Sequence, residues 1–309
     1  MRQFFQEGLG TLKGFEAKLV VDRDATPKFC KARTVPYLMK EKVEEELQRL
    51  TKEGILEPVE FVSWAAPIVP VLKSDKSSVR ICGDLNVTVN PVVKLDKYPI
   101  PKVEDLFAQL AGGKTFTKLD LSKGCQQLLL DEESKSYVVI NTHKGLFWYT
   151  RLPYGISSAP GIFRRVMESL LQGIPGVVVY IDDILITGAT EQEHLQTLEE
   201  VLSRLEKAGL HARKCKCRFM VPSVDYLGYR IDKEGLHPLP DKVKAIKEAP
   251  DPTSVTELKA YLGLLTYYSK FLPNLSTTLA PLYALLQKDY PWRWRGRESI
   301  LSFKGITHI

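Results

Sequence analysis

The feature that most constrains the fold of this chain is the tetrapeptide Tyr180-Ile181-Asp182-Asp183, which lies between two short apolar runs. The runs at 177–180 and 184–187 have the length and the β-branched content of buried strands, and the short connection between them favours a hairpin. Such a hairpin carries two adjacent carboxylates at its tip. Because carboxylates in apolar surroundings need a positive partner, the pattern points to a divalent metal ion.

A third acid, Asp120, ends another strand-like run at 116–121. Three carboxylates on strands can hold the two metal ions of a phosphoryl-transfer site. Paired aspartates at a turn are also common as solvated turn formers, and this alternative stays open for the tetrapeptide taken alone. Together with Asp120, the pattern predicts a site for nucleotide polymerisation.

Two cations precede these acids in the sequence. Lys73 and Arg80 flank a short turn between strands expected at 66–72 and 79–82. Cations so placed can close over a nucleotide triphosphate and neutralise its phosphates. A solvated basic hairpin is the alternative, and it is the simpler one in the absence of the acids.

Three further positions have chemistry that the sequence leaves open. Tyr154 lies in a rigid Pro-aromatic-Gly turn, either near an incoming base or as an ordinary turn before a helix. The alternating cations and cysteines at 214–218 favour a strand with its cysteines inward, whereas His211, Cys215 and Cys217 together could hold zinc. Lys216 could act there as a general acid toward departing pyrophosphate.

The overall composition is that of a globular protein of 309 residues, enough for two or three subdomains. Lys and Arg number 43 against 37 Asp and Glu, and the net charge of +6 suits a nucleic-acid partner without demonstrating one. The odd and scattered set of 5 cysteines predicts a reducing compartment. No apolar run approaches the roughly 20 residues of a membrane span, and the first residues lack a signal-peptide pattern. We therefore expect a protein that is neither secreted nor in a membrane.

Apolar periodicity and stop signals predict the helices and strands around these motifs. Helices are expected with inward stripes at Leu38, Val43, Leu47 and Leu50 and at Leu195, Leu198, Leu202 and Leu205. Ser254 and Glu257 form a predicted capping box. The expected helices are 38–53, 159–172, 191–208 and 258–272, a further hairpin is expected at 135–151, and residues 1–35 are expected to be an extended leader.

Several longer segments carry a resemblance to a known family. They are WAAPIVPV (64–71), VRICGDLNVTVNP (79–91), YPIPKVEDLFAQLAGGKTFTKLDLSKG (98–124), INTHKGLFWYTRLPYGISSAPGIF (140–163), VVVYIDDILITG (177–188) and VDYLGYRI (224–231). In these segments, and over residues 3 to 295 as a whole, the chain strongly resembles the reverse transcriptase of gypsy-type long-terminal-repeat retrotransposons, a part of the pol polyprotein.

The resemblance implies an α+β, right-hand polymerase fold with fingers, palm and a helical thumb or connection. The implied divisions are a leader after a missing protease (1–35), a first part of the fingers (36–92), the palm (93–232) with a second fingers segment at about 129–158, the thumb or connection (233–288), and a truncated start of a ribonuclease H region (289–309).

The resemblance also implies roles for individual residues of this sequence. Asp120, Asp182 and Asp183 match the metal-binding triad, with the carbonyl of Leu121 as a further metal contact. Lys216 matches a lysine of the closing motif of the palm. The implied nucleotide-binding residues are Lys73, Arg80, Leu121, Cys125 and Tyr154, and the implied primer-binding residues are Tyr226, Leu227 and Gly228.

The activity implied is that of an RNA-directed DNA polymerase, a nucleotidyltransferase that joins a dNTP to a primer 3′-hydroxyl with two Mg²⁺ ions, for which Mn²⁺ is a possible substitute. The implied partners are an RNA or DNA template, a DNA or tRNA-like primer and dNTPs. The location expected is the cytoplasm or retroelement particles, with the nucleus as an alternative.

The sequence departs from the family at three places. Cys125 stands where the family usually has an aromatic residue that excludes the ribose 2′-hydroxyl, which predicts weaker sugar discrimination. No protease motif accompanies the leader, and the chain stops soon after Trp292 and Trp294, where a ribonuclease H domain normally begins. These departures suggest a truncated copy without ribonuclease H activity. The alternatives are a non-catalytic nucleic-acid-binding remnant and a ribonuclease H assigned through the parent polyprotein.

Overall fold

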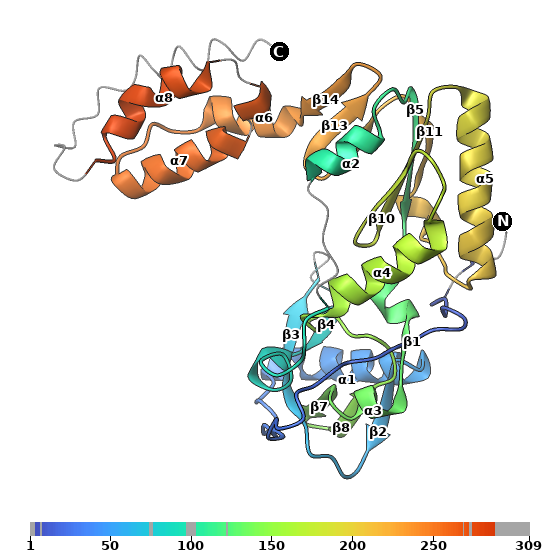
Figure 1. Ribbon diagram of the computed structural model, residues 1–309. Coiled ribbons are helices and arrows are strands. Elements are labelled where there is room, and N and C mark those ends of the chain that lie inside the picture. The colour runs from blue at the N-terminus through green and yellow to red at the C-terminus, as the bar shows by residue number, and fades with distance from the viewer. Residues whose placement is uncertain are drawn as a thin grey trace. The chain divides into compact units, whose positions relative to one another are not determined.

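The computed structural model describes residues 4–6, 8–73, 77–96, 103–121, 123–267, 269–271 and 274–287. The chain divides into two compact units, Met1–Pro222 and Ser223–Ile309. Each unit is a mixture of helices and mostly antiparallel sheet, which Figure 1 shows element by element. Among the described residues, no helix combines the length and the apolar character that crossing a membrane requires.

A five-stranded sheet forms one part of the first unit. It has the order β2 (Leu56–Val59), β8 (Gly145–Tyr149), β7 (Val139–Thr142), β3 (Ala66–Leu72) and β4 (Val79–Gly83). Only β3 and β7 run parallel; the other neighbours are antiparallel. The helix α1 (Tyr37–Lys52) packs on β4 and β2 and buries Val43, Leu47 and Leu50.

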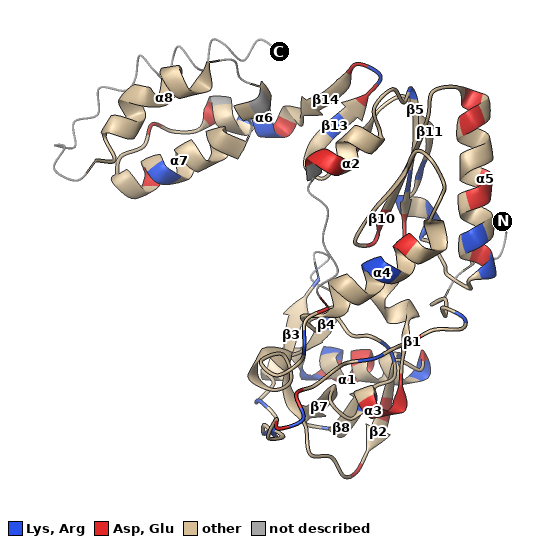
Figure 2. Ribbon diagram, in the orientation of Figure 1, with Lys and Arg blue, Asp and Glu red and all other residues tan. Residues whose placement is uncertain are grey.

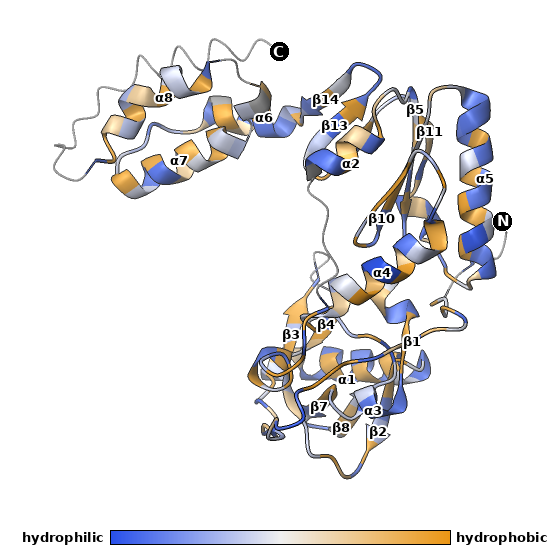
Figure 3. Cartoon of the chain, in the orientation of Figure 1, coloured by the Kyte–Doolittle hydropathy of each residue, from blue (hydrophilic) through white to orange (hydrophobic). Residues whose placement is uncertain are grey.

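A four-stranded antiparallel sheet forms the other part of the first unit. It has the order β11 (Arg218–Val221), β5 (Thr115–Asp120), β10 (Asp183–Gly188) and β9 (Val177–Tyr180). The helices α4 (Ala159–Leu171) and α5 (Glu191–Lys207) pack against β9 and β10 respectively, and α2 (Val103–Gln109) lies near β9. Figure 3 shows hydrophobic and hydrophilic residues alternating along α5, as expected for a helix with one buried face.

The N-terminal segment is extended, as predicted, but it belongs to the core of the first unit. Phe4, Leu12 and Leu19 are buried in the same apolar cluster as the two sheets. The short strand β1 (Glu16–Ala17) pairs in parallel with β6 (Leu129–Leu130). The Arg151 guanidinium donates hydrogen bonds to the segment, at 3.0 Å to the Gly10 carbonyl. A leader that only precedes the fold is therefore the wrong description of these residues.

The second unit contains a three-stranded meander followed by helices. The meander consists of β12 (Val224–Tyr226), β13 (Tyr229–Asp232) and β14 (Gly235–Pro238). The helices are α6 (Pro240–Glu248), α7 (Val255–Tyr267) and α8 (Leu275–Ala284). The boundary between the two units falls inside the segment 93–232 that we assign to the palm. The division into fingers, palm and thumb stays a prediction.

Most of the expected elements are present, with corrections at their edges. Leu38 and Leu195 are exposed rather than inward. In α5 the buried face begins with His194 and continues with Leu198, so Leu195 lies beside this face and not on it. The helix expected at 258–272 begins at Val255 and ends at Tyr267. Its cap differs in detail: the Ser254 hydroxyl accepts from the Glu257 N–H as predicted, but the Glu257 carboxylate accepts from the Thr253 N–H.

The hairpin expected at 135–151 is present as the antiparallel pair β7 and β8, and a short helix, α3 (Glu132–Lys135), precedes it. One further expectation is wrong. The strand expected at 214–218 is a 3₁₀ turn at Lys214–Lys216, so Cys215 is exposed while Cys217 is buried. The turn forms because the Arg213 N–H bonds to the Asp120 carbonyl and the Lys216 N–H bonds back to Arg213. Trp292 and Trp294 lie outside the described residues.

Candidate active site

The acidic hairpin is tighter than the sequence suggests. Tyr180 pairs directly with Asp183, so the turn consists of only Ile181 and Asp182. Ile181 has a φ of +53°, the sign that two-residue hairpin turns need and that a β-branched residue rarely adopts. Asp182 therefore lies at the tip, and Asp183 is the first residue of β10.

The register of β10 against β5 brings the third acid to the same place. Asp183 lies directly opposite Asp120. Just beyond the strand end, the Leu121 N–H donates to the Asp182 carbonyl at 3.0 Å. Three carboxylates from two distant parts of the sequence thus meet at one end of the sheet, as the motif predicted.

Two lysines neutralise two of the three acids. Lys216 Nζ lies 3.4 Å from Asp120 Oδ2, and Lys118 Nζ lies 2.8 Å from Asp183 Oδ2. Asp182 differs, because its Oδ1 is buried and accepts no hydrogen bond from the described residues. Burial, reinforced by the charges of Asp120 and Asp183 and opposed by Lys216, raises the pKa of Asp182 to about 6. This carboxylate lacks a positive partner of its own among the described residues.

Gly124 makes room for the Asp182 carboxylate. A Cβ at position 124 would lie 2.6 Å from Asp182 Oδ1 and 2.8 Å from the ring of Phe163. Any larger side chain would therefore displace the acid or the ring. Sequence reasoning missed this residue, because its contact with Asp182 joins segments that are distant in the sequence.

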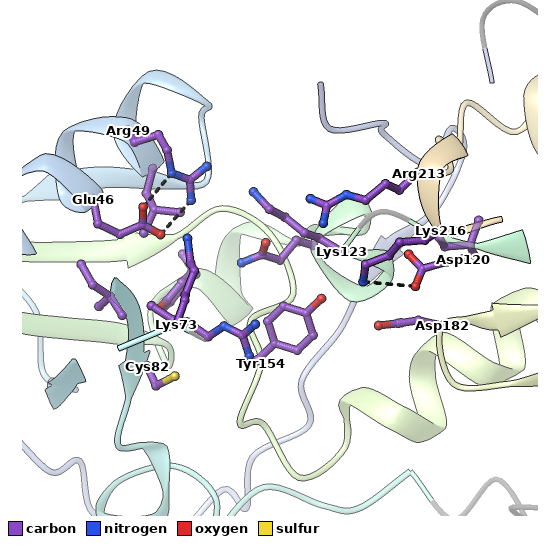
Figure 4. Close-up of a pocket in the computed structure, with 16 residues that line it drawn as sticks. Glu46, Arg49, Lys73, Cys82, Asp120, Lys123, Tyr154, Asp182, Arg213 and Lys216 are labelled. Carbon is purple, nitrogen blue, oxygen red and sulfur yellow. Dashed lines mark hydrogen bonds and ion pairs between the residues drawn. The ribbon is translucent and has the colours of Figure 1, made fainter. Parts of the chain in front are cut away.

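A cavity of about 410 Å³ opens in front of the acids. Asp120 and Asp182 line it on one side, and Glu46 and Arg49 of α1 line it on the other, as Figure 4 shows. Figure 2 shows that α1, β5 and β11 all carry Lys and Arg residues. The cations among the lining residues are Arg49, Lys73, Arg80, Lys123, Arg213 and Lys216.

The cavity collects most of the residues that the sequence singled out. Its lining includes the predicted Lys73, Arg80, Asp120, Leu121, Tyr154, Asp182 and Lys216. Asp183 and Cys125 are not part of the lining. The sequence analysis missed three lining cations, Arg49, Lys123 and Arg213. They come together at the cavity only by tertiary packing, which no local sequence pattern indicates.

Tyr154 lies among charged groups. Burial, reinforced by the charges of Asp182 and other acidic groups and opposed by Arg80, raises the pKa of its phenol well above the usual value. The side chain therefore remains a neutral hydroxyl at physiological pH. Figure 4 shows its ring in the cavity, with the hydroxyl directed toward the acidic side.

Cys125 lies beneath the cavity rather than in it. It belongs to the 3₁₀ turn Gly124–Gln127 and is 5% exposed. Burial, together with the charge of Asp182, raises the pKa of its thiol to about 12, so the sulfur is an uncharged thiol. The structure thus places a small apolar group at this position.

The predicted primer-binding turn lies in the second unit. Tyr226 pairs with Tyr229, and Leu227 and Gly228 form the two-residue turn with φ values of +50° and +84°. The Tyr226 side chain is buried. The hydroxyl of Tyr267 donates to the Leu227 carbonyl at 3.5 Å. Any contact with a ligand would therefore be made by the turn backbone rather than by the Tyr226 ring.

The donor set at the acidic end of the sheet fits a hard divalent cation. Carboxylates with a few open positions are what Mg²⁺ prefers, and the Asp182 carboxylate has a buried Oδ1 without a hydrogen-bond partner among the described residues. A tighter group of possible ligands, Asp232, Glu234 and His237, occurs at the β13–β14 turn. Asp232 Oδ1 there already accepts hydrogen bonds from two backbone N–H groups and from His237.

Comparisons with known proteins agree with this geometry. The profile of the family described as Reverse transcriptase (RNA-dependent DNA polymerase) matches residues 73–231, about half of the chain. The chain therefore belongs to the reverse transcriptase family. The predicted resemblance to gypsy-type retrotransposon enzymes is confirmed, since the relatives include Pol polyproteins from transposons.

The relatives are much longer than this chain. A Caenorhabditis elegans protein, uncharacterized protein K02A2.6, is 35% identical over 273 residues, which are 88% of this chain and 21% of that protein. The Retrovirus-related Pol polyprotein from transposon 297 of Drosophila melanogaster is 32% identical over 273 residues, which are 86% of this chain and 26% of that protein. The chain thus spans about a quarter of the relatives' length.

Solved structures of a foamy viral protease-reverse transcriptase have the same fold. A complex with double-stranded DNA has a TM-score of 0.85 at 25% identity, covering 98% of this chain and 54% of that one. A complex with an RNA/DNA hybrid has a TM-score of 0.82 at 25% identity, covering 98% and 41%. The predicted α+β right-hand polymerase fold is confirmed.

Proposed function

We propose that this chain is an RNA-directed DNA polymerase that transfers a nucleotide from a dNTP to the 3′-hydroxyl of a primer. The observation that carries the proposal is the placement of Asp120 and Asp182 on one side of a cavity whose lining holds six cations. A carboxylate pair supports metal binding, and an excess of cations supports binding of a polyphosphate. Membership of the reverse transcriptase family supports the same activity.

Asp120 and Asp182 are the residues that would hold two Mg²⁺ ions, with the Leu121 carbonyl as an additional oxygen and Mn²⁺ as a substitute. When bound, the ions supply positive charge at the attacking and leaving oxygens of the displacement. Asp183 contributes less, because Lys118 already neutralises it at 2.8 Å.

The other lining residues act on the nucleotide. Lys73 and Arg80 bind the triphosphate from the turn between β3 and β4, and charge-assisted contacts of this kind orient the phosphates. Lys216, whose Nζ lies 3.4 Å from Asp120 Oδ2, is the proposed proton donor to the departing pyrophosphate. Tyr154 contributes a neutral aromatic surface for the base and sugar.

The template and primer are RNA or DNA, with DNA or a tRNA-like RNA as primer. Most contacts would be to phosphates, so binding should weaken as salt increases. An A-form-like hybrid would be recognised by its shape and its 2′-hydroxyl groups. The turn at Leu227 and Gly228 is the proposed contact with the primer. The solved relative bound to an RNA/DNA hybrid supports this choice of ligand.

Primer extension tests the proposal. The assay combines the purified chain with an RNA template, a DNA primer, dNTPs and Mg²⁺, and the double variant Asp182→Asn with Asp183→Asn is the control. Extension that disappears in the variant supports a polymerase. A folded protein that binds the hybrid in a salt-dependent way but adds no nucleotide would instead be a nucleic-acid-binding remnant, the second candidate that the small Cys125 side chain favours.

Sugar discrimination is tested separately. We propose that Cys125 leaves room for a ribose 2′-hydroxyl, so Cys125→Tyr should lower rNTP incorporation relative to dNTP incorporation. Equal dNTP-to-rNTP ratios in the two proteins would show that position 125 does not control the choice of sugar.

A further inference from the structure

Lys123, one of the residues that line the cavity, has an unusual backbone conformation. It lies three residues after Asp120 and has a φ of +54°, in the left-handed region that is unfavourable for an L-residue. Glycine or asparagine would fit this backbone better. A lysine retained in such a conformation suggests that its side chain has a role.

The side chain of Lys123 crosses from the acidic side of the cavity toward α1. Figure 4 shows it between Asp120 and Asp182 on one side and Glu46 and Arg49 on the other. Its Nζ donates to Glu53 Oε2 at 3.2 Å. Glu53 follows the last turn of α1 and is not part of the cavity lining, whereas Lys123 is. The ammonium is thus drawn to the rim of the cavity by a carboxylate outside it.

The contact between Lys123 and Glu53 is a weak one. Both side chains are about one-third exposed, and ion pairs of this kind contribute little to stability. Glu53 also accepts a hydrogen bond from Arg49, which in turn donates to Glu46 at 2.7 and 2.8 Å. Without Lys123, Glu53 would still be paired with Arg49. Loss of Lys123 would therefore leave no unpaired charge.

We propose that Lys123 is a phosphate-binding residue of the nucleotide site, and that Glu53 holds its ammonium at the rim until an incoming triphosphate takes its place. This inference rests on the proposed polymerase function. A triphosphate carries several negative charges and three groups of acceptor oxygens, so it competes well with one shared carboxylate. Lys123 then joins Lys73 and Arg80 around the phosphates.

The proposal predicts effects of opposite sign for the two partners. The affinity for dTTP is measured by calorimetry with Mg²⁺ and a dideoxy-terminated primer on a template whose next base is adenine. Lys123→Met should weaken dTTP binding about ten-fold, as expected for the loss of one hydrogen bond to a charged group, and should affect dTMP much less. Glu53→Gln should tighten dTTP binding about two- to five-fold, because Lys123 is released. The double variant should resemble Lys123→Met.

Two further variants keep the test clear. Lys123→Gly suits the left-handed backbone, so it should remain folded and still lose dTTP affinity. Lys144 and Glu44 form a matched ion pair at 2.9 Å outside the cavity lining. Lys144→Met should therefore leave the dTTP affinity unchanged.

Two outcomes would overturn the proposal. One is an unchanged dTTP affinity in both Lys123→Met and Lys123→Gly. The other is a weaker dTTP affinity in Glu53→Gln as well as in Lys123→Met. That result would mean that the Lys123–Glu53 ion pair only stabilises the contact between two segments. In either case, extension by the wild-type protein would show that the polymerase function stands without this role for Lys123.

Discussion

At the scale of single residues, Asp182 is the acid whose environment is least favourable to its charge. Its pKa is raised to about 6 by burial and by the neighbouring acids. The unfolded chain has the ordinary value of about 3.9, so the charge costs folding stability above pH 6, progressively less between pH 6 and 4, and nothing below both values.

Asp182→Asn should therefore stabilise the metal-free protein at pH 7.5, by roughly 1 to 2 kcal/mol after allowance for solvent screening. The gain should vanish near pH 4, where both states are protonated. Urea denaturation in EDTA at the two pH values measures it. Asp183→Asn is the control, and since it removes the ion pair with Lys118 it should not stabilise the protein. The same gain at both pH values would contradict the account.

Gly124 provides a second test at this scale. Gly124→Ala should push the Asp182 carboxylate away, because the added Cβ would lie 2.6 Å from Oδ1. We expect Mn²⁺ binding, followed by electron paramagnetic resonance, to weaken at least about ten-fold, with a stability cost of about 1 to 3 kcal/mol.

The control is Gly263→Ala in α7, where an added Cβ meets nothing within 4 Å. This change should raise stability by about 0.5 to 1 kcal/mol and leave Mn²⁺ binding unchanged. Unaltered Mn²⁺ affinity in Gly124→Ala would mean that Asp182 does not need the space.

Site residues within a distinctive local sequence pattern could be predicted from the sequence. Site residues whose role depends on contacts with distant segments could not. Asp120, Asp182 and Asp183 stood out because acids at the ends of apolar runs are costly without a function. Lys123 and Gly124 carried no such signal. Their roles depend on Glu53 and Asp182, which reach them only through the packing of distant segments.

At the scale of elements, α5 is joined to the four-stranded sheet by a buried histidine. His194 is fully buried, and its Nε2 lies 2.7 Å from the Thr117 hydroxyl on β5. Burial lowers the pKa of His194, against a smaller opposing contribution from the Thr115 backbone. The folded state therefore favours the neutral ring.

Stability should fall as the pH falls below about 6.5, the unfolded histidine value, because the unfolded chain then binds more protons. The slope due to His194 is at most about 1.4 kcal/mol per pH unit. Urea denaturation between pH 8 and 5 should show this slope in the wild-type protein and in His211→Gln, and a reduced slope in His194→Gln. An equal slope in all three would rule out His194 as its source.

The elements themselves were largely predictable, and their exact ends were not. The strands on both sides of the acidic tetrapeptide could be predicted, because short apolar runs of this kind are typical of buried strands. Tyr180 pairs with Asp183, so Asp182 lies in the turn and Asp183 in the strand. This register depends on hairpin geometry. The 3₁₀ turn at Lys214–Lys216 depends on a backbone contact with Asp120, so alternation in the sequence was misleading there.

At the scale of the whole molecule, the chain consists of two compact units with separate cores. Leu262 of α7 is 3% exposed and belongs to the second unit. Leu262→Ala should destabilise that unit by about 2 to 5 kcal/mol and leave unchanged the Mn²⁺ binding that we propose for Asp120 and Asp182.

Denaturation followed by circular dichroism should then show one transition shifted to lower urea and one unmoved. Leu198→Ala in α5 is the counterpart in the first unit and should shift the other transition. A single transition that both variants shift equally would mean that the two units unfold together.

The ion pairs made by Lys118 and Lys216 have a practical consequence for the whole protein. Two of the three acids at the tip of the sheet are already neutralised by side chains of the protein itself. We therefore expect folding not to require divalent ions, in contrast to small zinc domains, which unfold when the metal is removed. We expect the protein to keep its circular dichroism spectrum in EDTA, and we expect the proposed polymerase activity to be absent there and to return when Mg²⁺ is added.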